Sequence, residues 1–365
     1  MRFDGTSPLT TRQWHYRLLR LPKGPLVCLL RAPLLVASVL YGALIHLRNR
    51  RYDRNPTLEQ NVAAPVISIG NITTGGTGKT PLVADVVARL LGMGRSPAIV
   101  TRGYGSDRAG EADEARLLAR SVEGVPCVIN ADRVAGAAEA IRVHRANVIV
   151  LDDAFQHRRI ARDMNIVTID ATCPFGLGYL LPRGYLREPR VGLRRADLVV
   201  LTRTDQVGAG RVYNLWREVE RLAPRARIVS TTHCPQPLRP LVAMPETDEA
   251  PVAGRAYLVS AIGNPDAFEQ SVRDRGIEVC GHSRFDDHHH YTARDVIVAC
   301  TAAAEAAADI VLVTEKDAVK LEQLDVRWYT PAWVLAVRID FVRDCGKILE
   351  AALQEALDRC EGRHG

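Results

Sequence analysis

The sequence predicts an α/β fold: a mostly parallel β-sheet with helices on both faces, a second and smaller α/β lobe, and an N-terminal membrane-associated helix. Two observations predict the sheets. Short apolar runs typical of buried strands alternate with helical patterns, and a proline-rich stretch at 234–251 separates a first series of runs from a second. We expect strands at residues 65–69, 98–101, 127–130, 148–151, 166–169, 198–202 and 228–230 in the larger lobe, and at 256–260, 278–281 and 310–314 in the smaller one.

Length and composition indicate a folded protein of about two domains. The chain has 365 residues, of which 47% are hydrophobic and 25% are charged, and a domain commonly contains about 100–200 residues. The net charge of +6 is compatible with several kinds of anionic partner and does not single out nucleic acid, so we expect no nucleic-acid partner. We divide the chain into a membrane-association segment (1–54), a core (55–233), a linker (234–251), a smaller lobe (252–344) and a C-terminal helix and tail (345–365).

An apolar segment at residues 25–45 is about as long as a helix that crosses a bilayer. Arg31 lies inside this segment, and Pro33 is expected to kink a helix there. Basic residues flank both ends, whereas a spanning helix usually has more Lys and Arg on one side. We therefore favour a helix that lies in the membrane interface and contacts anionic headgroups. A true span and a buried hairpin are the alternatives.

A glycine-rich loop follows the first strand of the core. The predicted strand 65–69 runs into Gly-Asn-Ile-Thr-Thr-Gly-Gly-Thr-Gly-Lys-Thr at 70–80, and a helical pattern follows at 82–91. A strand, a glycine loop ending in Gly-Lys-Thr and a helix form the context of a P-loop, which binds nucleotide phosphates. Pro81 fits the first turn of that helix. One residue departs from the strict motif, because Thr73 stands where its first glycine is expected.

The residue types of this loop suit triphosphate binding. Glycines let main-chain N–H groups approach phosphate oxygens, and the helix N-terminus adds its positive dipole. Lys79 is expected to reach the β- and γ-phosphates, and the hydroxyl of Thr80 to ligate Mg²⁺. The residues expected to contact the nucleotide here are Gly75, Gly76, Thr77, Gly78, Lys79 and Thr80.

A second predicted strand, 148–151, ends in two carboxylates, Asp152 and Asp153. Carboxylates at the C-terminal end of a strand beside the P-loop strand can hold Mg²⁺ directly or through water. We therefore expect both aspartates at the metal. An acidic turn with no metal role is the alternative interpretation.

Three classes of P-loop protein have to be distinguished: kinases, GTPases and partition-type ATPases. A GTPase carries Asn-Lys-x-Asp for base recognition, and the similar segment Thr-Arg-Thr-Asp at 202–205 lacks both Asn and Lys. A partition-type ATPase carries a lysine where this chain has Thr74. Both classes are therefore disfavoured, and a kinase is the preferred interpretation.

A series of further motifs runs along nearly the whole chain. After the N-terminal apolar helix, they are GNITTGGTGKTP at 70–81, TRGY at 101–104, DDAFQHR at 152–158, LPRGYLREP at 181–189, RRAD at 194–197, AIGNP at 261–265, FDDHHHY at 285–291 and TEKDAVK at 314–320. No single motif is decisive, but their joint occurrence in this order is specific. Together they resemble the lipid A 4'-kinase family, the tetraacyldisaccharide 4'-kinases.

The resemblance implies an activity and a location. Members transfer the γ-phosphate of ATP, with Mg²⁺, to the 4'-hydroxyl of an acylated glucosamine disaccharide 1-phosphate, which forms lipid IVA in lipid A biosynthesis. The implied location is the cytoplasmic face of the bacterial inner membrane, with the protein peripheral or held by its N-terminal helix. A substrate that stays in the bilayer explains why a P-loop domain carries the apolar segment at 25–45.

The resemblance also implies site residues. Asp113 is the implied base that accepts the proton of the sugar hydroxyl, with His288 beside it in a dyad. Arg187 is implied at the transferring phosphate, where a guanidinium suits phosphoryl oxygens. The other implied residues are Glu114 at the metal, Arg133, His157 and Tyr104 at the substrate, and Lys316 and Asp317 at the nucleotide.

Alternatives to these assignments remain. Asp113 also fits a solvated helix start, and the histidines at 288–290 invite a zinc site, although no fourth ligand stands at a metal spacing. Ala112 and Ala154 stand where the family has glycine, which leaves the local loop geometry open. A P-loop kinase for another membrane-bound or sugar acceptor, or a nucleotide-switched membrane adaptor that needs no base, are the alternative functions. For a kinase we expect ATP between two lobes whose closure brings His288 toward Asp113.

Overall fold

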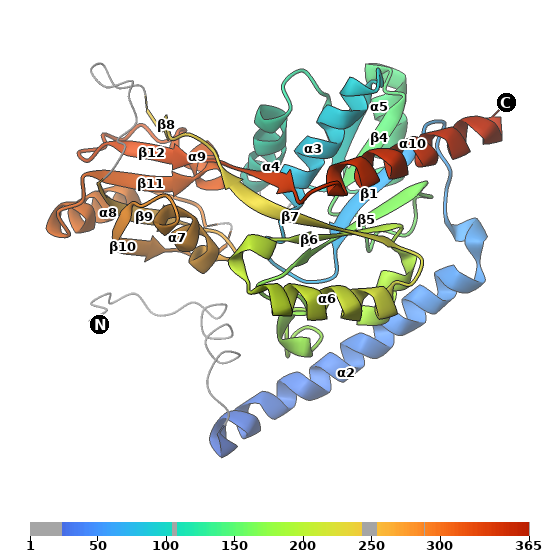
Figure 1. Ribbon diagram of the computed structural model, residues 1–365, viewed down its shortest axis with the longest axis horizontal. Coiled ribbons are helices and arrows are strands. Elements are labelled where there is room, and N and C mark those ends of the chain that lie inside the picture. The colour runs from blue at the N-terminus through green and yellow to red at the C-terminus, as the bar shows by residue number, and fades with distance from the viewer. Residues whose placement is uncertain (1–23, 104–107, 243–253, 288, 365) are drawn as a thin grey trace.

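The computed structural model describes residues 24–103, 108–242, 254–287 and 289–364. Within these residues the chain forms two β-sheets with flanking helices, and one long N-terminal helix that runs along the outside of the larger lobe (Figure 1). Both sheets are mainly parallel, which confirms the predicted fold class.

The larger sheet has eight strands. They are β1 (Val66–Asn71), β2 (Pro97–Thr101), β3 (Cys127–Ile129), β4 (Val148–Asp152), β5 (Met164–Asp170), β6 (Leu198–Thr202), β7 (Arg227–Pro235) and β13 (Val337–Phe341). Their order across the sheet is β13-β7-β6-β5-β1-β4-β2-β3, and neighbours are parallel except β13 and β7. Strands β1, β2, β4 and β6 are buried over their whole length, as expected of apolar runs in a sheet that is covered on both faces.

Helices cover both faces of this sheet. They are α3 (Lys79–Gly92), α4 (Arg108–Ser121), α5 (Arg133–His144), α6 (Ala209–Leu222) and α10 (Cys345–His364). Val83 of α3 and Leu353 of α10 form a buried cluster with Val200 of β6 on one face. Val199, the next residue along β6, faces the other way and packs in a second cluster with Val219 of α6. Successive side chains along a strand point to opposite faces of the sheet, so these apolar strands build a core on each side.

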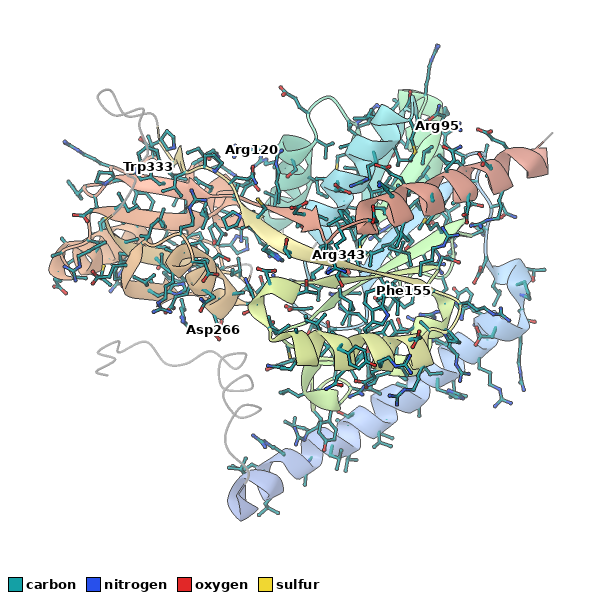
Figure 2. All side chains as sticks on the ribbon, in the orientation of Figure 1. Arg95, Arg120, Phe155, Asp266, Trp333 and Arg343 are labelled. Carbon is teal, nitrogen blue, oxygen red and sulfur yellow. The ribbon has the colours of Figure 1, made fainter. Side chains whose placement is uncertain are left out.

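The smaller lobe has a five-stranded sheet with three helices. Its elements are β8 (Arg239–Pro240), β9 (Arg255–Ser260), α7 (Pro265–Arg273), β10 (Glu278–Arg284), α8 (Ala293–Glu305), β11 (Ile310–Thr314), α9 (Glu315–Leu321) and β12 (Ala332–Leu335). The strand order is β10-β9-β11-β12-β8, with only the β12–β8 pair antiparallel. Trp333 lies in the interior of this lobe and Phe155 in that of the larger lobe (Figure 2). Four short 3-10 helices complete the described chain: η1 (Pro56–Leu58), η2 (Gly176–Gly178), η3 (Arg190–Arg195) and η4 (Thr204–Gln206).

Two neighbouring crossings connect the lobes. The chain leaves the larger sheet after β7 to form β8, and it returns from β12 to β13. The crossings are hydrogen-bonded to each other, from Gln236 N to Ala336 O at 2.9 Å. The sequence-based division assigned all of 252–344 to the smaller lobe, whereas β13 pairs with β7 in the larger sheet. This strand is short and alternates between half-buried and exposed residues, so no continuous apolar run marks it in the sequence.

The N-terminal helix α2 (Pro25–Arg54) has 30 residues. Its segment from Leu29 to Arg54 is long and apolar enough to cross a membrane, by length and composition alone. Pro33 lies inside the helix and does not end it, and Arg31 is buried. Most of its large apolar side chains face away from the protein, among them Leu29, Val39 and Leu44, which are 71%, 65% and 66% exposed.

Candidate active site

The phosphate-binding loop lies between β1 and α3, as the sequence predicts. Gly75 and Gly78 have φ angles of 101° and 83°, a region that favours glycine. Gly78 also lies close to β6, because a Cβ there would be 3.2 Å from Thr202 Cγ2. Thr73, which replaces the first glycine of the strict motif, is buried and forms a β-bridge with Leu186. The loop therefore does not need a glycine at residue 73.

Hydrogen bonds beneath the loop hold its backbone in place. The hydroxyl of Thr77 is buried, accepts from Asn71 Nδ2 at 3.0 Å and bonds to Thr168 Oγ1 at 2.7 Å. Thr202 Oγ1 donates to Thr77 O at 3.0 Å. The side chain and the carbonyl oxygen of Thr77 thus tie the loop to the sheet.

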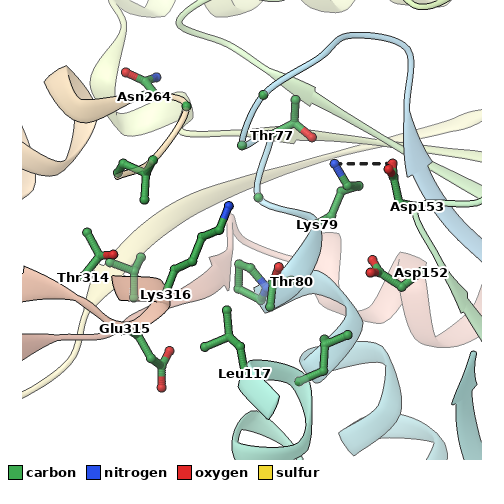
Figure 3. A pocket seen from close by; sticks show the side chains of 18 of the residues that line it. Thr77, Lys79, Thr80, Leu117, Asp152, Asp153, Asn264, Thr314, Glu315 and Lys316 are labelled. Carbon is green, nitrogen blue, oxygen red and sulfur yellow. Dashed lines mark ion pairs between the residues drawn. The ribbon is translucent and has the colours of Figure 1, made fainter. Parts of the chain in front are cut away.

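Lys79, Asp153 and Arg187 form one charged cluster beside the loop. Lys79 Nζ lies 3.5 Å from Asp153 Oδ1 (Figure 3), and Arg187 Nη1 donates to both carboxylate oxygens of Asp153 at 2.9 and 2.8 Å. Asp153 has a φ of 48°, in the left-handed region that Asp tolerates better than most residues. The neighbouring Ala154 is buried and has no positive φ, so an alanine fits where the family pattern has glycine.

The donor set next to this cluster fits magnesium. Asp152, at the end of β4, is buried, and its Oδ2 accepts from Thr101 Oγ1 at 3.3 Å. Thr80, in the first turn of α3, lines the same cleft (Figure 3). Hydroxyl and carboxylate oxygens are the protein ligands that Mg²⁺ takes, together with waters and substrate phosphates. In the part of the chain that the structure describes, no three His, Cys, Asp or Glu side chains gather into a metal site of their own.

Arg133 and His157 also line the cleft. Arg133 is only 2% exposed, and its guanidinium donates to the main-chain oxygens of Asn130 and Asp152 at 3.0 and 3.3 Å. It therefore supports the strand end that carries Asp152. Burial, reinforced by Arg133 and Arg162, lowers the pKa of His157 to about 4, so its ring is neutral at pH 7.

The smaller lobe faces the loop across the cleft. Lys316 of α9 reaches toward the loop (Figure 3), and its Nζ lies 2.9 Å from Asp287 Oδ1. Gly263 lies against the loop backbone, since a Cβ there would be 3.0 Å from Gly76 N and 3.1 Å from Gly75 Cα. The cleft between the lobes has a volume of about 1440 Å³. Common ligand pockets measure about 300–1,000 Å³, so this cleft can hold a nucleotide and part of a second substrate.

Asp317 does not line the cleft, although the sequence analysis places it at the nucleotide. Its carboxylate is fully buried in the smaller lobe and accepts from Ala261 N and Tyr291 OH at 3.0 Å each, and from Thr314 Oγ1 at 2.5 Å. Thr314 Oγ1 in turn accepts from Asp317 N at 3.2 Å, so Thr314 is the N-cap of α9. Asp317 thus holds the helix end that presents Lys316.

Four predicted residues lie, wholly or with their side chains, outside the part of the chain that the structure describes. His288 and Tyr104 lie outside the described residues, as do the side chains of Asp113 and Glu114. The backbone of both acidic residues belongs to α4, which packs against α3 and α9. The base, its dyad partner and the third metal carboxylate therefore stay predictions.

The site also contains residues that the sequence analysis did not assign. Arg203 Nη1 donates to Gly76 O at 2.9 Å and forms an ion pair with Asp170. Asn264 of the smaller lobe lies near the same carboxylate, with Nδ2 3.5 Å from Asp170 Oδ2 and 3.3 Å from Thr172 Oγ1. Asp170 ends β5, which is a neighbour of β1. A carboxylate at that strand end is a readable signal for a role beside the loop.

Comparisons with known proteins agree with this geometry. The family model described as Tetraacyldisaccharide-1-P 4'-kinase matches residues 30–357. A tetraacyldisaccharide 4'-kinase of Anaeromyxobacter sp. (strain Fw109-5) is 42% identical over 331 residues, which cover 85% of this chain and 87% of that protein. Another from Geobacter sulfurreducens is 35% identical over 314 residues, which cover 80% and 85%.

A solved structure extends the agreement to the fold. The crystal structure of LpxK from Aquifex aeolicus in complex with ATP matches with a TM-score of 0.66 and 26% sequence identity. The match covers 90% of this chain and 99% of that one, so it includes both lobes. With the family model matching most of the sequence, the chain belongs to the tetraacyldisaccharide-1-P 4'-kinase family.

Proposed function

We propose that this protein transfers the γ-phosphate of ATP to the 4'-hydroxyl of an acylated glucosamine disaccharide 1-phosphate, forming lipid IVA. One observation carries the proposal. The cleft that contains the phosphate loop is also lined by Tyr41, Ile45 and Arg48 of α2. A nucleotide site that opens onto an exposed apolar helix suits an acceptor with a polar sugar and acyl chains that stay in a membrane.

The cleft has the parts that phosphoryl transfer needs. The acceptor 4'-oxygen attacks the γ-phosphorus, the bond from that phosphorus to the β,γ-bridging oxygen breaks, and ADP leaves. Lys79, Arg187 and the main-chain N–H groups of the loop neutralise charge on the phosphoryl oxygens. We assign the proton of the attacking hydroxyl to Asp113, with His288 to orient the carboxylate or relay the proton.

Other residues hold the metal and the two substrates. Thr80, Asp152 and Asp153 offer oxygen ligands to Mg²⁺, with Glu114 as a further candidate, and the ion when bound supplies additional positive charge at the phosphates. Lys316 contributes to the nucleotide site from the smaller lobe. We assign the acceptor sugar to the part of the cleft lined by Arg133 and His157, together with Tyr104; the neutral ring of His157 suits a hydrogen bond to a sugar hydroxyl.

We place the protein at the cytoplasmic face of the bacterial inner membrane, as a peripheral protein held by α2. The exposed apolar side chains of this helix, including Val39 and Leu44, would enter the acyl region. Arg50, Arg51 and Arg54 near its C-terminal end are exposed and suit anionic headgroups.

A transfer assay tests the function. Labelled γ-phosphate from Mg-ATP is followed into acylated disaccharide 1-phosphate in detergent micelles, for the wild type, Lys79→Ala and Asp113→Ala. We expect a loss of at least about a hundredfold in both variants. A loss in Lys79→Ala alone would keep the kinase and remove Asp113 as the base. A wild type that hydrolyses ATP without transfer would point to another acceptor or to a nucleotide-switched adaptor.

A further inference from the structure

We propose that Tyr41 of α2 is a positioning residue for Arg187, so that docking of the membrane helix completes the active site. The inference rests on the proposed function, because it takes Arg187 as a group that contacts the transferring phosphate. It follows from a segment that lies between α2 and the phosphate loop and is hydrogen-bonded to both. We call this segment, residues 180–188, the strap.

Polar contacts join α2 to the start of the strap. Ser38 Oγ donates to Leu180 O at 2.7 Å and accepts from Arg183 N at 2.9 Å. Gly42, one turn further along α2, lies against Leu180, because a Cβ on Gly42 would be 2.8 Å from Leu180 Cδ1. Since an apolar helix face gives little directional preference, these hydrogen bonds define how α2 sits on the strap.

The end of the strap is bonded to the entrance of the phosphate loop. Arg187 N donates to Ile72 O at 2.8 Å, and Thr74 N donates to Tyr185 O at 2.7 Å. The strap and the loop therefore move together, and a displacement of one changes the backbone of the other.

Contacts with described residues hold Arg187 at three points. Its main-chain N–H bonds to Ile72, and its side chain bonds to both oxygens of Asp153, which also pairs with Lys79. The third point is its carbonyl oxygen, which accepts from Tyr41 OH at 2.7 Å. Tyr41 also lines the cleft, so its hydroxyl links α2 to the charged cluster of Lys79, Asp153 and Arg187. Without this bond, the peptide that carries the guanidinium is held at one fewer point.

Kinetics of Tyr41→Phe, which removes the hydroxyl and keeps the ring, test the inference. We expect kcat for phosphate transfer to fall about threefold to tenfold, the effect of one lost hydrogen bond, with KM for Mg-ATP changed less than about twofold. In an Arg187→Ala background the same change should have no further effect, because Tyr41 acts through Arg187. Tyr213→Phe, at an exposed tyrosine on α6, is the matched control.

Hydrogen exchange gives a readout that does not depend on transfer. The amide of Arg187 should exchange at least about threefold faster in Tyr41→Phe, while amides of α3 exchange as in the wild type. An unchanged kcat, an equal fall in both backgrounds or unchanged exchange at Arg187 would each overturn the inference. A wild type without transfer activity would instead overturn the proposed function, and the exchange measurement would still decide whether Tyr41 holds the strap.

Discussion

At the scale of single residues, the charge of His157 is set by its surroundings. Burial, reinforced by Arg133 and Arg162, lowers its pKa from 6.5 to about 4. In the unfolded chain the ring takes up a proton as the pH falls through about 6.5, whereas in the folded protein it stays neutral down to about 4. The His157 ring therefore lowers the free energy of unfolding progressively as the pH falls from 6.5 to 4, and it has no such effect at neutral pH.

We expect His157→Gln to lose less stability than the wild type between pH 6.5 and pH 4. Over this range the free energy of unfolding of His157→Gln should fall by on the order of 2 kcal/mol less than that of the wild type. Urea unfolding at both pH values measures it, with His144→Gln at an exposed position of α5 as the control. His233, whose pKa burial lowers to about 3, acts in the same direction in all three proteins and cancels. If the free energies of unfolding of the wild type and of His157→Gln change equally with pH, His157 is not the group responsible.

Sequence reasoning finds a site residue when the motif also defines the residue's neighbours. Lys79 follows from its place between a glycine loop and a helix, and the structure brings it to the carboxylate of Asp153. Asp317 stands in a Thr-x-x-Asp pattern, which is equally typical of a helix cap. Arg133 lines the cleft, but it is almost fully buried, and its guanidinium bonds to the main-chain oxygens of Asn130 and Asp152. In both cases burial determines what the side chain can contact, and burial depends on segments far away in the chain.

At the scale of elements, the sequence predicts strands best when they are buried on both faces. The apolar runs at 148–151 and 198–202 are β4 and β6, both buried throughout. Strands β12 and β13 were not predicted, because the first has four residues after Pro331 and the second alternates in exposure. The β-bridge of Thr73 to Leu186 joins residues that are far apart in sequence, so no local pattern could indicate it.

The exposed face of α2 should determine membrane binding. Leu40 and Leu44 lie one turn apart and are 62% and 66% exposed, so replacing both with Asp removes apolar area without opening the core. We expect Leu40→Asp with Leu44→Asp to weaken binding to anionic lipid vesicles at least about tenfold in co-sedimentation. Leu91→Asp, at an exposed position on α3, is the control and should bind like the wild type. Equal binding of all three proteins would mean that α2 is not the anchor.

At the scale of the whole molecule, charged and close backbone contacts join the lobes around the cleft. Glu322, just after α9, accepts from Arg120 of α4 at 2.5 Å (Arg120 is labelled in Figure 2). Gly263 lies against the phosphate loop. Within the described residues, only two crossings of the chain connect the lobes, so the angle between the lobes can change. We therefore expect these contacts to hold the lobes in a closed arrangement around ATP.

Gly263→Ala tests this closure. The added methyl would lie 3.0 Å from Gly76 N, and main-chain atoms cannot move aside as a flexible side chain can. We expect KM for Mg-ATP to rise about tenfold, and small-angle scattering to show less compaction with a non-hydrolysable ATP analogue than in the wild type. Gly210→Ala, on α6 with nothing within 4 Å, is the matched control. If the wild type has the same scattering profile with and without the ATP analogue, the lobes do not close on ATP. A Gly263→Ala protein that compacts as much as the wild type would show that the loop accommodates the added methyl.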